Sequence, residues 1–367
     1  MSYVQMNNGA PVSTGAASTP AEAGAPLRIL PAPQPVRVAV VGATGYSGAE
    51  LTAILARHRY ADISGLFSST GGAKGPVSPS RPDLVAEPFA IEKLLDAAPA
   101  VVFLATPNEV SAHLAPKLLD AGIRVIDISG AFRLQDPALY PTWYGFAHER
   151  PELLAEAVYG LTEFANGDLS TARLIANPGC YPTSILLALR PLTYLIDRAQ
   201  PVICDSKSGV SGAGKKSDLA WSFAEVSGNF KAYSVGTHRH EPEIRSGLRL
   251  GDRAPLVFVP HLLPTIRGIL STMHIAFTNP MTADEITSIY KATFANAPLV
   301  NVLPAGALPE LKNVVNTPRA EIGFTLLHGG RRAVVVSVID NLLKGAASQA
   351  VQNFNRMCGY DEVEGLA

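Results

Sequence analysis

The apolar runs that follow residue 35 predict a parallel sheet covered by helices. The first of them, Val36–Val41, is β-branched and almost wholly apolar, as expected of a strand buried on both faces. After it, in chain order, we expect a helix at Ala49–His58, strands at Ile63–Phe67 and Ala100–Ala105, a helix at Val110–Ala121 and a strand at Val125–Ile128. This alternation predicts a Rossmann-like α/β domain with a parallel, doubly wound sheet.

Beyond Cys180 the pattern changes to longer strand-like runs with few helices between them. Strands are expected at Val202–Asp205, Leu256–Val259, Leu270–Phe277, Ala320–Leu327 and Arg332–Ile339. Consecutive strands without crossover helices favour a mixed or antiparallel sheet, and hence a second domain of the α+β class. The last strong element, Leu342–Met357, is predicted to be an amphipathic helix.

The chain has 367 residues, enough for two domains with cores of their own. A formal net charge of −1 and 47% hydrophobic residues are ordinary for a globular protein and indicate neither a nucleic-acid nor a membrane partner. Three cysteines are too few for a disulfide framework, and no C-x-x-C pair indicates a structural metal. We therefore expect no metal and a reducing, cytoplasmic location.

Residues 1–35 are rich in Ala, Gly, Pro, Ser and Thr and show neither helical nor strand periodicity. This composition predicts a disordered tail. The segment has no basic stretch followed by an apolar one, as a secretory signal would have, and Arg28 is the only basic residue before Arg37. A secretory signal or transit peptide is therefore not expected.

Three glycines directly follow the first expected strand, in the order Gly42-Ala-Thr-Gly45-Tyr-Ser-Gly48. A strand, a glycine turn and a helix in this order are typical of a dinucleotide-binding unit, in which phosphates lie against the backbone of the turn. The residues expected at the cofactor are Gly42, Thr44, Gly45, Tyr46, Ser47 and Gly48. Because the spacing is G-x-x-G-x-x-G, a turn that needs glycine only for its backbone angles is the alternative.

The end of the second expected strand bears on the choice of cofactor. NAD sites usually carry Asp or Glu about 20 residues after the glycines, whereas here Ser68 and Ser69 follow the strand, with Lys74 nearby. Hydroxyl groups and a lysine suit a 2′-phosphate and favour NADP, although ordinary loop polarity would also account for the two serines. Thr106 and Pro107 end a later strand and are expected to line the cofactor cleft.

One cysteine stands at a position suited to catalysis. The loop-forming Asn177-Pro178-Gly179 precedes Cys180, and the apolar run Ser184–Leu189 beyond it indicates a helix. A thiol just ahead of a helix N-terminus lies in a field that favours the nucleophilic thiolate. With a nicotinamide cofactor, such a thiolate would attack an activated carbonyl and give a thioester or hemithioacetal that exchanges hydride with the cofactor. The alternative is that Cys180 is only a small buried hydrophobic residue.

This chemistry needs an acid–base group, because protons must move on a tetrahedral intermediate. The segment His238-Arg239-His240-Glu241-Pro242-Glu243 holds two of the eight histidines and is the best candidate. We expect His240 to be the acid–base group, with His238 second, and a structural role is the alternative for either. A metal site at the pair lacks a clear third ligand.

Anionic groups of a cofactor or substrate need cations and hydrogen-bond donors. Arg133 and Arg267 are candidates, because a guanidinium can hold a carboxylate or phosphate through two hydrogen bonds; surface ion pairs are the alternative. The segment Ser208–Gly214 is expected to be a glycine-rich loop whose N–H groups bind the pyrophosphate or a leaving phosphate. Its members with expected contacts are Ser211 and Gly212 at the cofactor and Ser208 at the substrate.

Together these motifs resemble those of the N-acetyl-γ-glutamyl-phosphate reductases, an arginine-biosynthesis family related to aspartate-semialdehyde dehydrogenase. The motifs that carry the resemblance are Gly42–Leu51, Asn177–Thr183, Ser208–Gly214, His238–His240 with Pro242–Ile244, Pro260–Leu262, and Asp340–Ala347 with Gln349-Ala350 and Gln352-Asn353. One departure bears on Arg133: the family tends to have an acidic residue where this chain has Ala131. Any contact which that carboxylate makes in relatives is therefore not carried over.

The resemblance implies NADPH-dependent reduction of N-acetyl-γ-glutamyl phosphate to N-acetylglutamate semialdehyde, with release of phosphate. It implies that Cys180 forms the thioester, that a histidine of the His-Arg-His motif transfers protons, and that Asn177 belongs to the substrate site. It also implies that Asn341 contacts the cofactor and that the helix after it returns to the nicotinamide side of the cofactor domain. A homo-oligomer, a dimer or tetramer, is expected as well. The domains expected on this basis are a tail at 1–35, an NADP-binding domain at 36–179 with 342–367, and a catalytic and oligomerisation domain at 180–341.

Other proteins on the same fold are alternatives. Aspartate-semialdehyde dehydrogenase differs in the histidine motif, whereas the corresponding reductase of aminoadipate-type lysine biosynthesis is poorly separated by sequence. A non-catalytic NADP-binding regulator would have no need of Cys180, and a structural scaffold gives no reason for Cys180 and His240 to occur together with the glycine turn.

Overall fold

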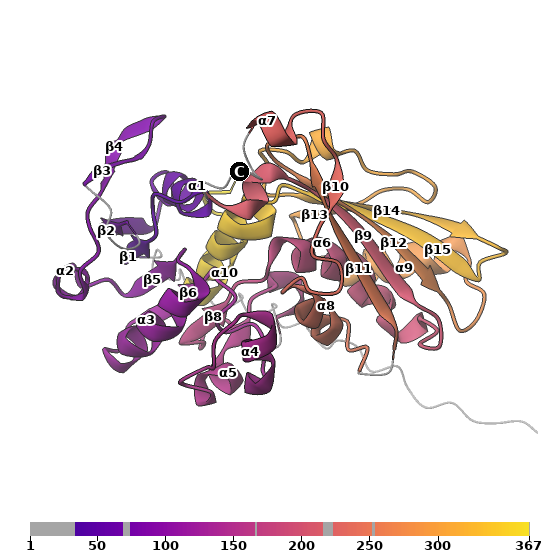
Figure 1. The fold of residues 1–367 in the computed structure, drawn as a ribbon, viewed down its shortest axis with the longest axis horizontal. Coiled ribbons are helices and arrows are strands. Elements are labelled where there is room, and N and C mark those ends of the chain that lie inside the picture. Colours follow the sequence, from indigo (N-terminus) through magenta and orange to yellow (C-terminus); the bar gives the residue numbers. More distant parts are fainter. Residues whose placement is uncertain (1–33, 69–73, 166, 216–222, 252–253, 367) are drawn as a thin grey trace, which may run out of the picture. The chain divides into compact units, whose positions relative to one another are not determined.

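The computed structural model describes residues 34–68, 74–165, 167–215, 223–251 and 254–366. The predicted tail therefore lies outside the described residues, apart from Gln34 and Pro35, and so does Ser69. Within the described chain, two large sheets and their helices account for most of the fold (Figure 1). No helix in these ranges is both long enough and apolar enough to span a bilayer.

The first sheet has six strands, all parallel, in the order β2-β1-β5-β6-β8-β7. Its strands are β1 (Val36–Val41), β2 (Ala61–Phe67), β5 (Val101–Leu104), β6 (Arg124–Asp127), β7 (Val158–Tyr159) and β8 (Leu174–Ala176). The accompanying elements are the hairpin β3 (Gly75–Ser78) and β4 (Arg81–Ala86), and the helices α1 (Tyr46–Leu55), α2 (Ile91–Asp96), α3 (Asn108–Asp120), α4 (Tyr140–Trp143) and α5 (Glu152–Glu156). This confirms the predicted Rossmann-like α/β domain.

Both faces of this sheet are covered, which explains why its strands read as continuous apolar runs. In β1, Val38 and Val40 pack with α1 and the C-terminal helix α10 (Ser348–Cys358). The alternate residues Ala39 and Val41 pack on the opposite layer with leucines of α3. A polar residue at any of these positions would have no route to water.

Helix α1 begins at Tyr46, three residues before the predicted start at Ala49. The low helix propensity of glycine accounts for the sequence-based error. In the structure Gly48 lies so close to the preceding turn that a Cβ at this position would be 2.1 Å from the carbonyl oxygen of Gly42. The glycine thus permits the helix to start inside the turn.

The second sheet has seven strands in the order β10-β11-β9-β12-β15-β14-β13, with both parallel and antiparallel neighbours. Its strands are β9 (Val202–Gly209), β10 (Lys231–Ala232), β11 (Leu256–Leu263), β12 (Ile269–Ala276), β13 (Val300–Val302), β14 (Ala320–Leu327) and β15 (Arg332–Ile339). The helices of this part are α6 (Cys180–Leu189), α7 (Phe223–Val226), α8 (Glu241–Gly247) and α9 (Ala283–Thr293). The predicted α+β class with a mixed sheet is confirmed.

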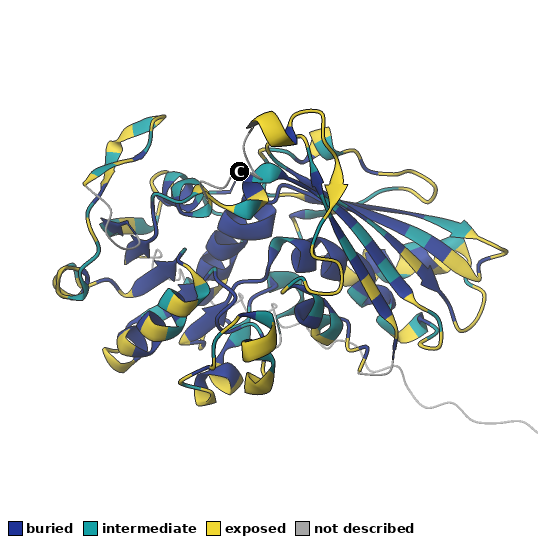
Figure 2. Ribbon diagram, in the orientation of Figure 1, coloured by how far each residue is buried: buried dark blue, intermediate teal, exposed yellow. Residues whose placement is uncertain are grey.

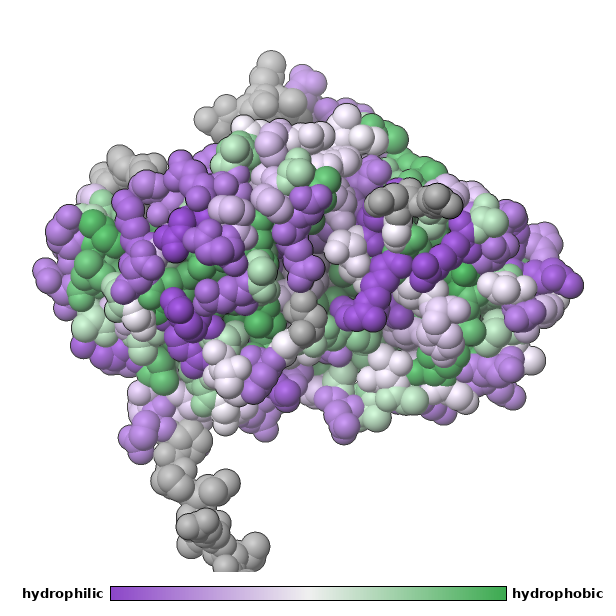
Figure 3. Space-filling view, turned by 90° about the horizontal axis from the view of Figure 1, so that it is seen from below, coloured by the Kyte–Doolittle hydropathy of each residue, from purple (hydrophilic) through white to green (hydrophobic). Residues whose placement is uncertain are grey.

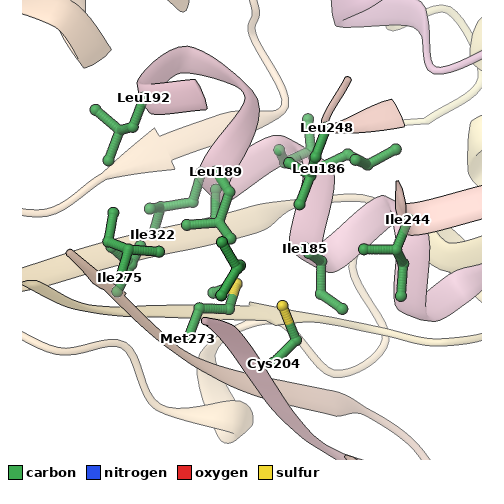
Figure 4. Close-up of a cluster of buried hydrophobic side chains, with 14 of the residues drawn as sticks. Ile185, Leu186, Leu189, Leu192, Cys204, Ile244, Leu248, Met273, Ile275 and Ile322 are labelled. Carbon is green, nitrogen blue, oxygen red and sulfur yellow. The ribbon is translucent and has the colours of Figure 1, made fainter. Parts of the chain in front are cut away.

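Helix α6 fills the core between this sheet and α8. Leu189 of α6 lies on the side of Met273 and Ile275 of β12, whereas Leu186 lies beside Leu248, directly after α8 (Figure 4). Cys204 of β9 is fully buried in the same cluster, and burial raises the pKa of its thiol. Cys204 is therefore a core residue, far from the character of a nucleophile.

The segment Ser208–Gly214 is not the single loop that the sequence predicts. Strand β9 continues through Gly209, and Val210–Ala213 then form a 3-10 turn. Ladder pairing with both β11 and β12 holds Ser208 in the strand, because a central strand satisfies its backbone groups on both sides.

The predicted C-terminal amphipathic helix is divided in two and has no exposed polar face. Leu343–Ala347 form a π-helical turn, and α10 follows directly. Figure 2 shows α10 buried along nearly its whole length, including its polar residues Gln349, Gln352 and Asn353. These side chains meet the segment that follows β7 rather than water.

A buried ion pair joins this turn to that segment. Lys344 Nζ donates to Glu163 Oε1 and to Gln352 Oε1, both at 2.6 Å. The Glu163 and Lys344 side chains are 1% and 0% exposed. Burial alone would raise the pKa of Glu163, but the Lys344 ammonium and the hydrogen bonds outweigh it and hold that pKa below its usual value. The Glu163 carboxylate therefore carries its charge in the core, against the Lys344 side chain.

Replacing Lys344 by methionine should lower the free energy of unfolding by about 3–5 kcal/mol, because the Glu163 carboxylate would remain buried without a counter-charge. Denaturant titration near neutral pH measures this loss. The loss should shrink in acid: without the cation, burial raises the folded-state pKa of Glu163, and a group so shifted destabilises the fold only above its unfolded-state pKa.

The matched control is Lys312→Met, which removes an exposed partner of Glu310. Exposed pairs contribute little, so this control should behave like the parent chain. Equal effects from the two substitutions, or a loss that is independent of pH, would contradict the charged state assigned to Glu163.

Candidate active site

A cavity of about 760 Å³ is lined by the segments that follow β1, β5, β6 and β9 and by the start of α6. The carboxyl ends of parallel strands are where open α/β sheets bind their ligands. The predicted site residues that line this cavity are Ser47, Thr106, Pro107, Arg133, Cys180, Ser211, Gly212, His238, His240 and Asn341. Residues from distant parts of the sequence thus meet in one place.

Cys180 is the first residue of α6, whereas the sequence predicts it just ahead of the helix. Gly179 precedes it in an extended conformation and provides no side-chain cap. Burial raises the pKa of the Cys180 thiol, and the opposing effects of Arg133 and the Tyr181 backbone do not cancel it. The raised pKa favours the thiol over the thiolate that the sequence predicts, so Cys180 needs a neighbouring base to take its proton.

His240 supplies a neutral imidazole next to the nucleophile's loop. A Cβ on Gly179 would lie 2.5 Å from His240 Nε2, so glycine is required for this approach. Burial, followed by the charges of neighbouring groups, places the pKa of His240 well below its usual value. Its Nδ1 is buried and has no hydrogen-bond partner among the described residues. Arg133 Nη1 lies 3.5 Å from His240 Nε2, and because a guanidinium can only donate, the neutral ring carries its hydrogen on Nδ1 and can accept a proton at Nε2.

His238 lies beside His240, with 4.8 Å between the ring centroids. Its Nδ1 accepts a hydrogen bond from the His240 backbone N–H at 3.1 Å. Burial, with a smaller effect of the Arg239 charge, lowers the pKa of His238 to about 4. His238 is thus also neutral, but one of its nitrogens is already engaged in holding the His240 backbone.

Glu243 is the functional group that the sequence analysis missed. It lies in the first turn of α8, is 2% exposed, and accepts hydrogen bonds from the Gly179 N–H at 2.9 Å and the Tyr159 hydroxyl at 2.7 Å. It also pairs with Arg133 Nη1 at 3.4 Å. The only sequence signal was its place in the histidine motif. Glu243 links the nucleophile's loop to the predicted anion-binding arginine.

Arg133 is fixed from three directions. Its Nε donates to the Asn177 carbonyl at 2.8 Å and its Nη2 to the Ile128 carbonyl at 2.7 Å, while Glu243 supplies the counter-charge. Burial opposes the charged form, but Glu243 outweighs it and raises the pKa of Arg133. The carboxylate that balances Arg133 thus comes from α8, and the departure at Ala131 leaves no charge unpaired.

Three predicted substrate residues, Arg267, Asn177 and Ser208, lie outside the lining of this cavity. Arg267 pairs with Asp340 at 2.9 Å and Glu50 at 2.7 Å, so two carboxylates already balance it. Asn177 is fully buried and bonds the Ala346 carbonyl and the Asn353 side chain. Ser208 donates to the carbonyl of the next residue, at 3.0 Å. Each of the three thus has partners within the chain, and its contact with substrate stays a prediction.

The glycine turn fits a dinucleotide, although only Ser47 of its predicted contacts lines the cavity. A Cβ on Gly42 would lie 2.2 Å from the Ala105 carbonyl oxygen, so part of the glycine pattern serves the turn's own packing. The N-terminus of α1 has no side-chain cap. Its unpaired N–H groups and positive dipole end suit a pyrophosphate. The contacts of Gly42, Thr44, Gly45, Tyr46 and Gly48 with the cofactor stay predictions, and the uncapped helix start is consistent with contacts made by backbone N–H groups.

The two described groups that favoured a 2′-phosphate have partners within the chain. The Ser68 hydroxyl donates to the Glu87 carbonyl at 3.3 Å, and Lys74 pairs with the Glu87 carboxylate at 3.1 Å. Ser68 does not line the cavity. Loop polarity, the alternative reading of these serines, accounts for Ser68.

The π-helical turn brings Gly345 against the nucleophile. A Cβ at this position would lie 2.8 Å from the Cβ of Cys180. Asn341, just before the turn, lines the cavity and donates to the Ser211 hydroxyl at 2.9 Å. Single π-helical turns inside helices often occur at functional sites. The C-terminal segment therefore shapes the site as well as the core.

Comparisons with known proteins assign the two parts of the chain to one family. Residues 37–172 match the family model described as "Semialdehyde dehydrogenase, NAD binding domain", and residues 180–341 match "Semialdehyde dehydrogenase, dimerisation domain". The first of these matches confirms the predicted nicotinamide cofactor.

Curated relatives are similar over nearly their whole length. The N-acetyl-gamma-glutamyl-phosphate reductase of Halorhodospira halophila is 45% identical, covering 90% of this chain and 98% of the relative. That of Geobacillus thermodenitrificans is 44% identical with the same two coverages.

Solved structures show the same fold at low sequence identity. Aspartate semialdehyde dehydrogenase II of Vibrio cholerae gives a TM-score of 0.66 at 17% identity, covering 88% of this chain and 98% of that one. The enzyme of Candida albicans gives a TM-score of 0.61 at 14% identity, covering 89% and 99%. By its two domains and its curated relatives, the chain belongs to the N-acetyl-γ-glutamyl-phosphate reductase family of semialdehyde dehydrogenases and is an enzyme.

Proposed function

We propose that the chain reduces N-acetyl-γ-glutamyl phosphate to N-acetylglutamate semialdehyde and releases phosphate, as a step of arginine biosynthesis. The cofactor is NADP(H). The observation that carries the proposal is that Cys180, His240 and Arg133 line one cavity at the carboxyl ends of the parallel strands. The names of the curated relatives support the choice of substrate.

In the proposed mechanism, the Cys180 sulfur attacks the acyl carbon while neutral His240 accepts the thiol proton. The C–S bond forms, the C–O bond to phosphate breaks, and a thioester remains on Cys180. Because the pKa of the thiol is raised and that of the imidazole lowered, this transfer is unfavourable in the empty cavity. The negative charge of a bound acyl phosphate favours the imidazolium and so opposes the shift of His240.

The second half of the reaction uses the same groups in reverse. Bound NADPH supplies the hydride that reduces the thioester carbon. The protonated His240 then gives its proton to the oxygen that becomes the hemithioacetal hydroxyl, and collapse restores the thiol and frees the aldehyde. Throughout, Glu243 holds the Gly179 N–H and Arg133, which keeps the nucleophile's loop and the cation in register.

The direct test is phosphate-dependent oxidation of three aldehydes with NADP⁺: N-acetylglutamate semialdehyde, aspartate semialdehyde and the aminoadipate analogue. We expect kcat/KM for the first to exceed that for aspartate semialdehyde by about 100-fold or more, because unmatched polar groups of the substrate are rejected strongly. Preference for the aminoadipate analogue would move the enzyme to lysine synthesis, and absence of turnover with all three would refute an acyl-phosphate reductase.

We also propose a homo-oligomer, a dimer or tetramer, formed through the face of the second sheet opposite α6. The match to a dimerisation domain over residues 180–341 supports this. That face carries half-exposed apolar residues, among them Ile203, Val257 and Val334. A different face of the molecule, in Figure 3, shows hydrophobic side chains scattered among hydrophilic ones. Light scattering that gives the mass of a single 38.7 kDa chain would refute the assembly.

The cytoplasmic location of the protein stays a prediction.

A further inference from the structure

Two cationic side chains line the cavity, and they differ in whether hydrogen bonds and ion pairs within the protein already engage them. Among the described residues of its lining, Arg133 and Arg239 are the only arginine or lysine side chains. Arg133 is 7% exposed in its side chain and already holds two carbonyls and Glu243. A guanidinium so engaged has little capacity left for a substrate anion.

Arg239 has no such partners. It is exposed, and no hydrogen bond or ion pair joins its side chain to any residue within the described ranges. It stands between the two histidines of the site, His238 and His240. Arg239 lines the same cavity as His238, His240 and Cys180, so the guanidinium lies in one space with the proposed reacting groups. An unpaired cation at this position is available for a ligand's negative charge.

The depth of these groups indicates which anion it would meet. His240 is 6% exposed and Cys180 is half-buried, whereas Arg239 is exposed. Because Cys180 and Arg239 line the same cavity, a substrate whose acyl carbon reaches Cys180 can place a charged group at its other end beside Arg239. The reacting end has donors of its own, because Cys180 begins α6, whose N-terminus has no side-chain cap.

We propose that Arg239 binds the carboxylate at the end of the substrate remote from the acyl phosphate. This rests on the proposed function, since it requires an acyl-phosphate substrate that also carries a carboxylate. The planar guanidinium can grip a carboxylate with two parallel hydrogen bonds, which also fixes the direction of the chain toward Cys180. Arg239 thereby selects acidic substrates over neutral aldehydes of the same length.

The test compares Arg239→Gln with the parent chain in the oxidative direction. Its probes are N-acetylglutamate semialdehyde and 4-acetamidobutanal, which is the same molecule without the carboxylate. We expect Arg239→Gln to raise KM for the first about 10–100-fold, the range of charge-assisted hydrogen bonds. It should change kcat/KM for 4-acetamidobutanal and KM for phosphate far less, because neither of these involves the substrate carboxylate, although the loss of a cation beside His238 and Cys180 affects both aldehydes to the same small extent. Arg239→Lys should recover part of the loss.

Arg198→Gln is the matched control, because Arg198 is also exposed but lies outside the cavity lining. It should change none of the three constants. A rise in KM for phosphate in Arg239→Gln would assign the residue to phosphate instead, and equal losses with both aldehydes would refute recognition of the carboxylate.

The outcome is separable from that of the proposed function. If the parent chain prefers one of the other two semialdehydes, the proposed substrate is wrong, yet the comparison can be run with that aldehyde and its decarboxylated counterpart. If the parent chain oxidises no carboxylate-bearing semialdehyde, both the function and the role of Arg239 are overturned.

Discussion

Replacing Cys180 by serine should lower kcat for N-acetyl-γ-glutamyl phosphate by at least about 10³-fold, because a serine hydroxyl is a far weaker nucleophile than a thiol. Serine is nearly the same size and fits the close contact with Gly345, so the fold should be retained. The dissociation constant for NADPH, measured by fluorescence titration, should therefore change by less than about twofold.

The control for this substitution is Cys358→Ser. Cys358 ends α10, outside the cavity lining, and burial raises the pKa of its thiol to about 11. Turnover should be unaffected by its loss. If Cys180→Ser lost NADPH binding as completely as turnover, the residue would have to be assigned a structural rather than a chemical role.

Replacing His240 by asparagine should lower kcat by about 10²–10⁴-fold, the usual contribution of a positioned acid–base group. His238→Asn should cost clearly less, because the His238 ring supports the His240 backbone and asparagine can still accept that hydrogen bond. Steady-state NADPH oxidation by both variants measures the order. A larger loss of kcat in His238→Asn than in His240→Asn would assign the acid–base role to His238.

The pH dependence of kcat/KM gives a second, independent test of the role of His240 as the base. A base acts in its neutral form, and burial lowers the pKa of His240. The rate should therefore fall on the acid side only below the usual histidine pKa of about 6.5. In His240→Asn that acid limb should disappear, whereas a limb that persists would belong to another group.

The fold was predictable where apolar runs were unambiguous. Strands β1, β14 and β15 match their predicted ranges, because each is a run of recurring apolar residues of ordinary strand length. Helix starts were less predictable. The sequence places the start of α6 after Pro182, yet Pro182 lies in the first turn, where its missing N–H costs nothing.

The candidate reacting residues of the site could be predicted from residue types, but the hydrogen bonds and ion pairs that hold them in place could not. Cys180, His240 and Arg133 carry local motif signals and line the cavity together. Glu243 acts on Gly179, 64 positions earlier, and Arg267 is balanced by Glu50, 217 positions away. Such pairings follow from tertiary contacts, so a single sequence gives no means to distinguish a free arginine from a balanced one.

For the C-terminal helix α10, the sequence likewise provides no means to predict that its polar residues are buried. Its alternation of polar and apolar residues predicts one face in water. The structure instead places Gln352 and Asn353 against the segment that contains Gly160 and Glu163. Amphipathic periodicity shows that one face of a helix is polar, but not whether that face meets water. Polar groups within the protein can satisfy the hydrogen bonds of such a face as well as solvent does.

The most direct test of the account is the intact mass of the protein after incubation with N-acetyl-γ-glutamyl phosphate in the absence of NADPH. Without hydride the reaction should stop at the thioester, so we expect one N-acetylglutamyl group per chain, located by peptide mapping at Cys180 and absent from Cys180→Ser. An unmodified Cys180 in a chain that turns over with NADPH, or an acyl group on any other residue, would contradict covalent catalysis by this thiol.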